Sequence, residues 1–254
     1  MSDDAAAAVL TEQRGRVLII TLNRPDQMNA FNADQANGLD AAMTELNTND
    51  GLTAAVLTGN GKGFSSGMDL KAFMTGEDIS AWVNFIRDGA QKPIIAAVEG
   101  FALAGGLETA LACDLMIAST GAKFGVPEVK RGLIAAGAGL FRLPGRIGYA
   151  KAMELAITGD NIVAEEALEL GLLTQVTEVG GALDAAVELA ERIAKNAPLA
   201  VAASKAVIQA TQGNTEAELW AIQEPLRAKV FSSNDAKEGP TAFAEKREPN
   251  WTGT

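Results

Sequence analysis

Residues Val98–Glu128 read VEGFALAGGLETALACDLMIASTGAKFGVPE. Two glutamates, Glu108 and Glu128, lie here in segments that are otherwise almost wholly apolar or rich in glycine. Because desolvation opposes the ionised form of a carboxyl group, a glutamate in such surroundings needs a partner or a chemical task. The pair Gly105-Gly106 precedes Glu108 at an expected helix start, where backbone N–H groups are open to a ligand. The stretch therefore predicts two acid/base carboxylates beside an oxyanion-binding backbone.

Each glutamate also has an ordinary structural explanation. Glu108 could complement the helix dipole from the first turn, but its neighbours on the same face, Ala104, Leu111 and Ala112, are apolar. Glu128 follows a proline and could lie in a surface turn, so its interpretation depends on the pairing with Glu108. Buried carboxylates with perturbed pKa values gather at functional sites, which favours catalysis for the pair.

The amino-acid composition limits which reactions this protein could catalyse and which partners it could bind. The chain has 254 residues, enough for one large domain, and a formal net charge of −11, which disfavours nucleic acid as a partner. It contains no histidine, so Ser-His-Asp, Cys-His and His-ligated zinc chemistry is excluded, and no metal or redox cofactor is indicated. The lone Cys113 cannot form an intrachain disulfide, and no targeting or membrane-spanning segment is evident. We expect a soluble, cytoplasmic protein.

The pattern of apolar runs predicts an α/β fold with largely parallel buried strands. The expected strands are Val17–Leu22, Ala54–Thr58, Pro93–Val98 and Cys113–Ala118. Helices are expected between them at 32–46, 80–88 and 106–112. After about residue 145 the pattern becomes mostly helical, with helices expected at 164–170, 182–195, 199–212, 215–231 and 234–246 and a short strand at 174–179.

The glycine-rich loop Gly61–Lys71, GKGFSSGMDLK, could hold an anion. It matches neither the Walker A pattern nor the dinucleotide-binding pattern, so alone it is weak evidence. It follows a buried strand and precedes a short helix expected at Asp69, which places backbone N–H groups where an anion could bind.

Several motifs in order resemble the enoyl-CoA hydratase/isomerase (crotonase) family over nearly the whole chain. The matching pieces are LNRPDQMNAF (22–31), GFSSGMDLK (63–71), ALAGGLETALACD (102–114), FGVPE (124–128) and TAFAEKR (241–247). The resemblance implies a spiral of ββα units over 1–195, which carries the active site. It also implies a helical region over 196–254 that supports a homotrimer or homohexamer and contributes CoA contacts.

The resemblance also implies an acyl-CoA thioester substrate, with coenzyme A as part of the substrate and no separate cofactor. The backbone N–H groups of Met68 and Gly105 would form the oxyanion hole. Glu108 would deprotonate the water that attacks a trans-2-enoyl-CoA, and Glu128 would protonate the α carbon. Substrate or CoA contacts would come from Arg24, Gln27, Met28, Ser66, Asp69, Leu70, Lys71, Phe243 and Lys246. Of these, Lys71 and Lys246 would lie near the CoA phosphates or adenosine, where neighbouring subunits could supply them, with Phe243 alongside.

The chain departs from the family pattern at two informative positions. Asp26 stands where many relatives have a lysine near the CoA phosphates, and Ala104 replaces the first of three glycines. The alternatives are an enoyl-CoA double-bond isomerase, a hydratase of a specialised acyl-CoA, and a non-catalytic acyl-CoA-binding protein. Retention of both glutamates counts against the first and the last of these.

Overall fold

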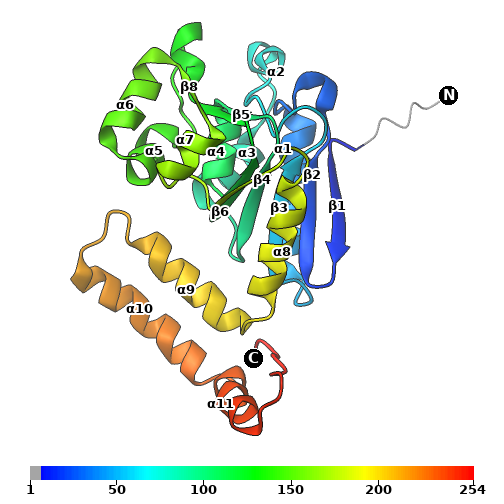
Figure 1. Cartoon of the computed structure of the whole chain (residues 1–254), viewed down its shortest axis with the longest axis vertical. Coiled ribbons are helices and arrows are strands. Elements are labelled where there is room, and N and C mark those ends of the chain that lie inside the picture. Colours follow the sequence, from blue (N-terminus) through cyan, green and yellow to red (C-terminus); the bar gives the residue numbers. More distant parts are fainter. Residues whose placement is uncertain (1–6) are drawn as a thin grey trace, which may run out of the picture.

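A six-stranded sheet forms the centre of the molecule (Figure 1). The computed structural model describes residues 7–254. The strand order is β1-β2-β3-β4-β6-β9, and only β1 runs antiparallel to its neighbour. The strands are β1 (Val9–Arg14), β2 (Val17–Leu22), β3 (Ala54–Gly59), β4 (Ile94–Val98), β6 (Leu115–Ser119) and β9 (Gln175–Thr177).

Both faces of this sheet are covered, which explains the continuous apolar strands. Ile19 and Val56 belong to a cluster beneath α8 (Ala182–Ala194), whereas Leu18 and Leu57 belong to the larger core on the opposite face. Successive side chains of a strand point to opposite faces, so an apolar residue is needed at every position. In Figure 1, α8 lies on one face of the sheet and α1, α3 and α4 lie on the other.

A second, three-stranded sheet consists of β5 (Phe101–Leu103), β7 (Lys123–Gly125) and β8 (Asn161–Val163). β5 and β7 run parallel, with Leu103 opposite Gly125, and the N–H of Ala104 donates to the carbonyl of Gly125 at 2.9 Å. The segments that carry Glu108 and Glu128 leave the carboxyl ends of β5 and β7. This small sheet therefore brings the two glutamates to one edge.

Eleven α-helices and two short 3-10 segments complete residues 7–254. Asn32 caps the first helix by accepting from the Gln35 N–H, and Asp69 caps the second by accepting from the N–H groups of Lys71 and Ala72. The remaining elements are α1 (Ala33–Thr48), α2 (Leu70–Thr75), α3 (Ser80–Asp88), α4 (Gly105–Leu111), α5 (Gly139–Ile147), α6 (Tyr149–Thr158), α7 (Ala164–Glu169), α9 (Pro198–Ala210), α10 (Glu216–Phe231), α11 (Asp235–Glu245), η1 (Pro25–Gln27) and η2 (Pro127–Arg131).

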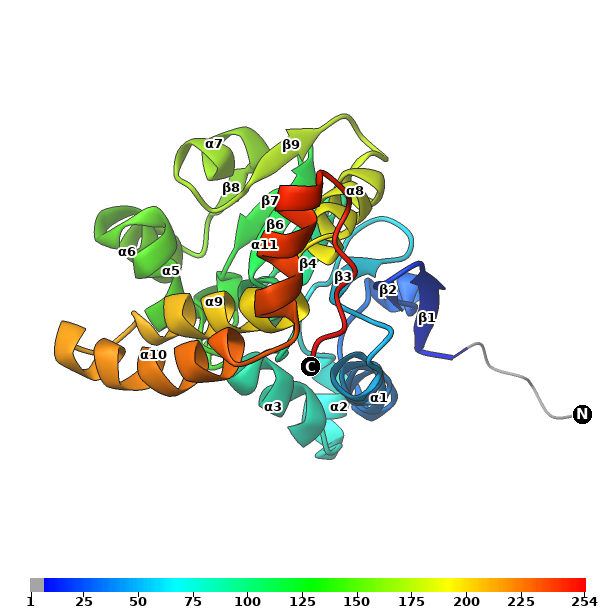
Figure 2. The same ribbon diagram turned by 90° about the horizontal axis from the view of Figure 1, so that it is seen from below.

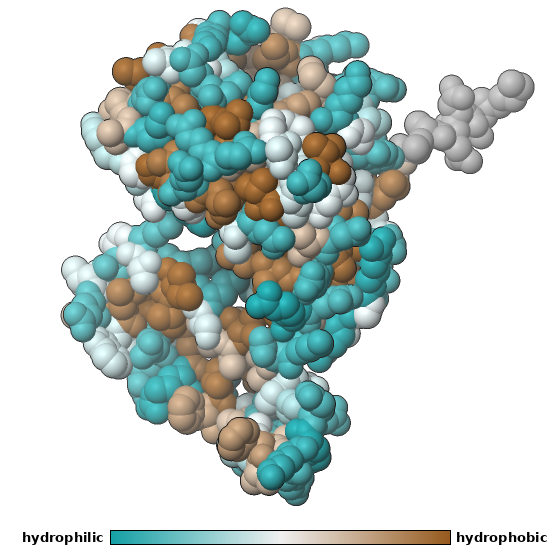
Figure 3. All heavy atoms as spheres, in the orientation of Figure 1, coloured by the Kyte–Doolittle hydropathy of each residue, from teal (hydrophilic) through white to brown (hydrophobic). Residues whose placement is uncertain are grey.

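The last three helices extend away from the sheets (Figure 1 and Figure 2). Neither α9 nor α10 has a fully buried residue, and both carry exposed apolar side chains, including Ile208, Trp220 and Phe231. Figure 3 shows apolar surface on this extension as well as on the body. Lys205 of α9 ties the extension to the body through an ion pair with Asp114 at 2.7 Å.

The expected α/β architecture and the helical C-terminal part are confirmed, and most expected elements lie within two residues of their observed bounds. The sequence did not predict β1, the three strands of the small sheet, or the helices α5 and α6. Five of the six side chains of β1 are exposed, and the strands of the small sheet have only three residues each, so neither shows an apolar pattern. Among residues 7–254, no helix is both long enough and apolar enough to span a bilayer.

Candidate active site

A cavity of about 960 Å³ opens between α2, α3, α4 and the segment that follows β7. Ten of the residues expected at the site line it: Gln27, Met28, Ser66, Met68, Asp69, Leu70, Lys71, Gly105, Glu108 and Glu128. A cavity of this size fits an extended small-molecule ligand. The structure therefore collects most of the predicted site in one place.

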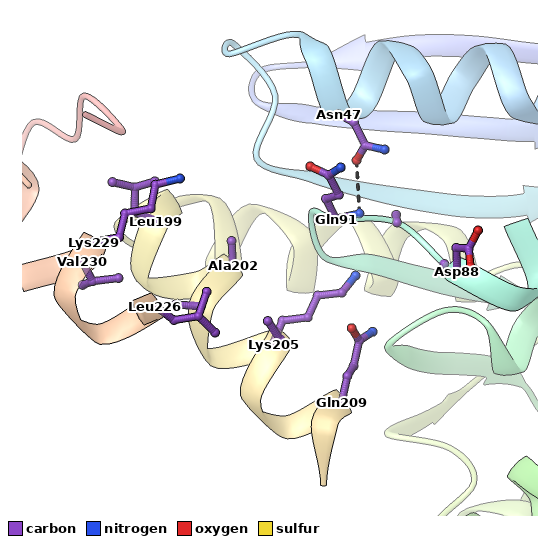
Figure 4. A pocket seen from close by; sticks show the side chains of 14 residues that line it. Asn47, Asp88, Gln91, Leu199, Ala202, Lys205, Gln209, Leu226, Lys229 and Val230 are labelled. Carbon is purple, nitrogen blue, oxygen red and sulfur yellow. Dashed lines mark hydrogen bonds between the residues drawn. The ribbon is translucent and has the colours of Figure 1, made fainter. Parts of the chain in front are cut away.

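A smaller cavity of about 510 Å³ lies between the helical extension and the turn that joins α3 to β4 (Figure 4). Its lining carboxylate, Asp88, forms an ion pair with Arg87 at 2.7 Å, and the Gln91 N–H donates to the Asn47 side chain at 3.2 Å. Asp88 and the Gln91 N–H thus already have protein partners. The larger cavity, which contains both expected glutamates, is the candidate active site.

Glu108 is held deep in this cavity by a loop distant in sequence. Its side chain belongs to α4, the residue is 4% exposed, and Oε1 accepts from the Gly139 N–H at 2.9 Å. A Cβ at Gly137 would lie 2.6 Å from Oε2, so glycine allows the loop to approach this closely. Burial raises the pKa of Glu108, while the N–H groups of Gly139 and Gly137 oppose that rise. These backbone donors stabilise the carboxylate form.

Glu128 has a different environment on η2, at the other side of the cavity. Its Oε2 is buried and accepts or donates no hydrogen bond within residues 7–254. Burial raises the pKa of Glu128 to about 7, and the nearby charge of Glu108 adds to the effect. This carboxyl group therefore keeps its proton to a higher pH than an exposed glutamate does. The two carboxyl groups therefore differ in their hydrogen-bond partners, although burial raises the pKa of both.

Two backbone N–H groups, those of Met68 and Gly105, are free to bind an oxyanion. Neither donates a hydrogen bond to another group in the described part of the chain. Gly67 has a φ of +97°, and a Cβ there would lie 2.7 Å from the nitrogen of Gly105. The glycine therefore permits the loop before α2 and the start of α4 to come together. Paired N–H groups of this kind stabilise negative charge on a reacting carbonyl oxygen.

Ala104, which precedes this donor, adopts φ +52° and ψ −131°, a conformation that strongly favours glycine. We expect Ala104→Gly to raise the free energy of unfolding by roughly 1 kcal/mol, because relief of strain exceeds the added entropy of the unfolded chain. Urea denaturation measures the change. Ala228→Gly, in the exposed interior of α10, is the control and should lower stability by about 1 kcal/mol. Equal losses in both variants would show that Ala104 is unstrained.

Three residues expected to bind substrate or CoA do not line the cavity of this chain. Arg24 instead pairs with Asp69 at 3.1 Å and donates to the carbonyl of Ala30, so it supports the cap of α2. Phe243 is exposed on α11, and Lys246 follows that helix, at the end of the molecule opposite α2 in Figure 1. Any contact of the last two with substrate would require a second subunit.

Neither the backbone contacts of Glu108 nor the cavity-lining residues of α3 were predicted from the sequence. The loop glycines Gly137 and Gly139 contact Glu108 across about thirty residues of chain, and no local pattern indicates that contact. The apolar residues of α3 that line the cavity, Trp82 and Ile86, did leave a signal, because they belong to a regular helical stripe. Asp114 lies outside the cavity and has a structural role, since its carboxylate accepts from the N–H of Ile94 at 2.8 Å at the start of β4.

Comparison with known proteins places these features in a family. The family model "Enoyl-CoA hydratase/isomerase" matches residues 12–254. "Enoyl-CoA hydratase EchA19" of Mycobacterium tuberculosis is 41% identical over 95% of each chain, and "Short-chain-enoyl-CoA hydratase" of Clostridium acetobutylicum is 37% identical over 94% of this chain and 95% of the relative. A crystal structure of an enoyl-CoA hydratase from Mycobacterium tuberculosis H37Rv superposes with a TM-score of 0.94 at 54% identity, covering 98% of this chain and all of that one. The chain belongs to the enoyl-CoA hydratase/isomerase family.

Proposed function

We propose that this protein is an enoyl-CoA hydratase, which adds water to a trans-2-enoyl-CoA and yields a 3-hydroxyacyl-CoA. The observation that carries the proposal is one cavity with two carboxyl groups, Glu108 and Glu128, beside the free N–H groups of Met68 and Gly105. The names of the relatives support the same activity. No cofactor is needed beyond the coenzyme A of the substrate.

The proposed mechanism follows from the environments of the two carboxyl groups. The thioester oxygen accepts from the N–H groups of Met68 and Gly105, which draws electron density from the β carbon. Glu108, stabilised as a carboxylate by Gly139, takes a proton from water as the water oxygen bonds to the β carbon. Glu128 gives its proton to the α carbon, which restores the thioester carbonyl. Dehydration runs through the same groups with their roles reversed.

Residues that line the cavity are proposed to bind the CoA portion of the substrate, and the C-terminal helices are proposed to form the oligomer. Gln27, Met28 and Ser66 are placed to contact the CoA portion, and Lys71 is a cation for its phosphates. We propose that residues 196–254 assemble a homotrimer or homohexamer, in which Phe243 and Lys246 reach a neighbouring active site. The exposed apolar side chains of α9 and α10 support such contacts. The buried, unpaired thiol of Cys113 is consistent with the cytoplasmic location that we propose.

The direct test is incubation with crotonyl-CoA, following loss of enoyl-thioester absorbance and identifying the product by mass. A gain of one water with the hydroxyl group on the β carbon supports the hydratase. A parallel incubation with a 3-enoyl-CoA tests the isomerase alternative, for which the product would have a shifted double bond and an unchanged mass. Tight CoA binding without turnover of any enoyl-CoA would contradict both and favour a non-catalytic binding protein.

We expect kcat/KM to fall as the pH rises above about 7, in both directions of the reaction. Hydration begins with Glu128 protonated and Glu108 ionised, while dehydration begins with the reverse arrangement; both forms hold one proton on the pair. Loss of that proton, governed by the pKa of about 7 at Glu128, stops either direction. A crotonyl-pantetheine thioester should show the same decrease in kcat/KM at high pH. Because it lacks the nucleotide phosphates, its profile reports no titration of groups that bind them. A flat profile to pH 9 would contradict the assignment.

A further inference from the structure

One face of α3 forms an apolar wall of the active-site cavity. Its members are Ile79, Trp82, Val83 and Ile86, which recur at the i, i+3, i+4, i+7 spacing of a single helical face. Leu70 of α2 lines the same cavity. This set contains no polar or charged side chain, so it presents a continuous apolar surface to a ligand.

The inner end of this wall reaches the reacting groups. Trp82 and Ile86 are only 5% and 3% exposed. A Cβ at Gly105 would lie 2.5 Å from the Trp82 ring, and a Cβ at Gly137 would lie 3.2 Å from Ile86 and 2.6 Å from the Glu108 carboxylate. Trp82 thus flanks an oxyanion donor and Ile86 flanks the proposed base. An acyl group that starts at these groups meets the wall at its first carbons.

The outer end of the wall is exposed to solvent. Four large apolar side chains that line the cavity have the following exposed fractions: Val83 48%, Leu70 52%, Phe73 55% and Ile134 66%. Single exposed apolar residues need no explanation, but a group of them around one cavity is typical of a surface that a ligand covers. The gradient from buried to exposed residues therefore traces a path for an apolar chain leading outward from the reaction centre.

We infer that the acyl group of the substrate is an extended apolar chain of about eight carbons or more. The inference rests on the proposed hydratase function. A crotonyl group has one methyl group beyond its β carbon and would contact only the inner end, near Trp82 and Ile86. A longer chain would cover Val83, Phe73 and Ile134 as well, removing their surface and its own from water.

The first experiment measures kcat/KM for trans-2-enoyl-CoA thioesters of four, six, eight and ten carbons. Each methylene that is buried against the wall should raise kcat/KM by roughly two- to fourfold, so the eight-carbon substrate should exceed crotonyl-CoA by roughly tenfold or more. Hydration of every substrate with a flat or falling series would overturn the inference and leave the hydratase function intact. Absence of hydration at every length would instead overturn the proposed function.

The second experiment places a charge on the wall with Val83→Asp. The ratio of kcat/KM for the eight-carbon substrate over that for crotonyl-CoA should fall at least roughly tenfold, because the longer chain alone must desolvate the new carboxylate. Val163→Asp is the matched control, since Val163 is 41% exposed, lies outside the cavity and precedes α7 at a position that suits aspartate. In Val163→Asp, the ratio of kcat/KM for the eight-carbon substrate over that for crotonyl-CoA should equal the ratio in the unmodified protein.

Phe73→Asp provides an independent second variant, because Phe73 lies on α2 and is more than half exposed. Thermal unfolding of each variant identifies any that does not fold, and the ratio is compared among those that do. If the ratio of kcat/KM for the eight-carbon substrate over that for crotonyl-CoA were unchanged in both Val83→Asp and Phe73→Asp, the acyl chain would not follow this wall.

Discussion

Glu128→Gln is expected to lower kcat for hydration by roughly 10²–10⁴-fold with little change in KM. Glutamine keeps the size and much of the hydrogen-bonding capacity of the side chain but cannot give a proton to the α carbon. The Oε2 of Glu128 makes no hydrogen bond within residues 7–254 that the substitution would break. Steady-state kinetics with the best substrate of the length series measure the effect.

Glu108→Gln should cause a loss of similar size, because the attacking water then has no base. The kcat of the double variant should be only slightly lower than that of either single variant. Each single substitution already removes one of the two proton transfers that the reaction needs. Glu45→Gln makes the same chemical change on an exposed residue of α1 and should retain full activity. Near-normal turnover in Glu108→Gln and Glu128→Gln would disprove the two-glutamate mechanism.

Gly67→Ala is expected to lower kcat/KM by roughly 10²–10³-fold, the effect of losing one oxyanion donor. The new Cβ would lie 2.7 Å from the nitrogen of Gly105 and 3.0 Å from the Cβ of Ala104. Because both neighbours belong to the packed start of α4, the two N–H donors must move apart. Initial rates measure the catalytic loss, and binding of free CoA should be retained.

The control for this variant separates backbone strain from displacement of the donors. Gly121 has a similar positive φ, +75°, and no atom lies within 4 Å of its Cβ position. Gly121→Ala should therefore cost about 1 kcal/mol of stability and leave kcat/KM unchanged. If Gly67→Ala and Gly121→Ala reduced activity equally, the close approach at Gly67 would have no role in the oxyanion hole.

The sequence predicted the inner strands of the central sheet, β2, β3, β4 and β6, because they are buried on both faces. Ile19, Leu57 and their neighbours form nearly continuous apolar runs, a signal that does not depend on distant contacts. It also predicted where Glu108 and Glu128 lie, because a carboxylate in an apolar segment is conspicuous. The cavity that contains both glutamates agrees with that prediction, while their separate roles stay proposals.

What the sequence could not predict depends on contacts between remote segments. The environment that distinguishes the glutamates comes from the Gly139 N–H at Glu108 and from the buried Oε2 of Glu128, which has no hydrogen-bond partner within residues 7–254. The exposed strand β1 and the three-residue strands of the small sheet carry no local apolar pattern. Phe243 was expected at the site from family resemblance, and its distance from the cavity in one chain follows from the extension of the last helices.

The pairing of β5 with β7 has a consequence for how this molecule could be redesigned. Leu103 is fixed opposite Gly125, and the segments that carry Glu108 and Glu128 begin at the ends of these two strands. Backbone hydrogen bonds between the strands therefore set the distance between the two carboxyl groups of the proton relay. The apolar wall comes from α2 and α3, which belong to neither strand. Exchanging the α2–α3 segment should therefore alter which acyl-CoA is preferred while the relay keeps its dimensions. In this fold, the segments that set the spacing of the two carboxyl groups are different from those that form the apolar wall.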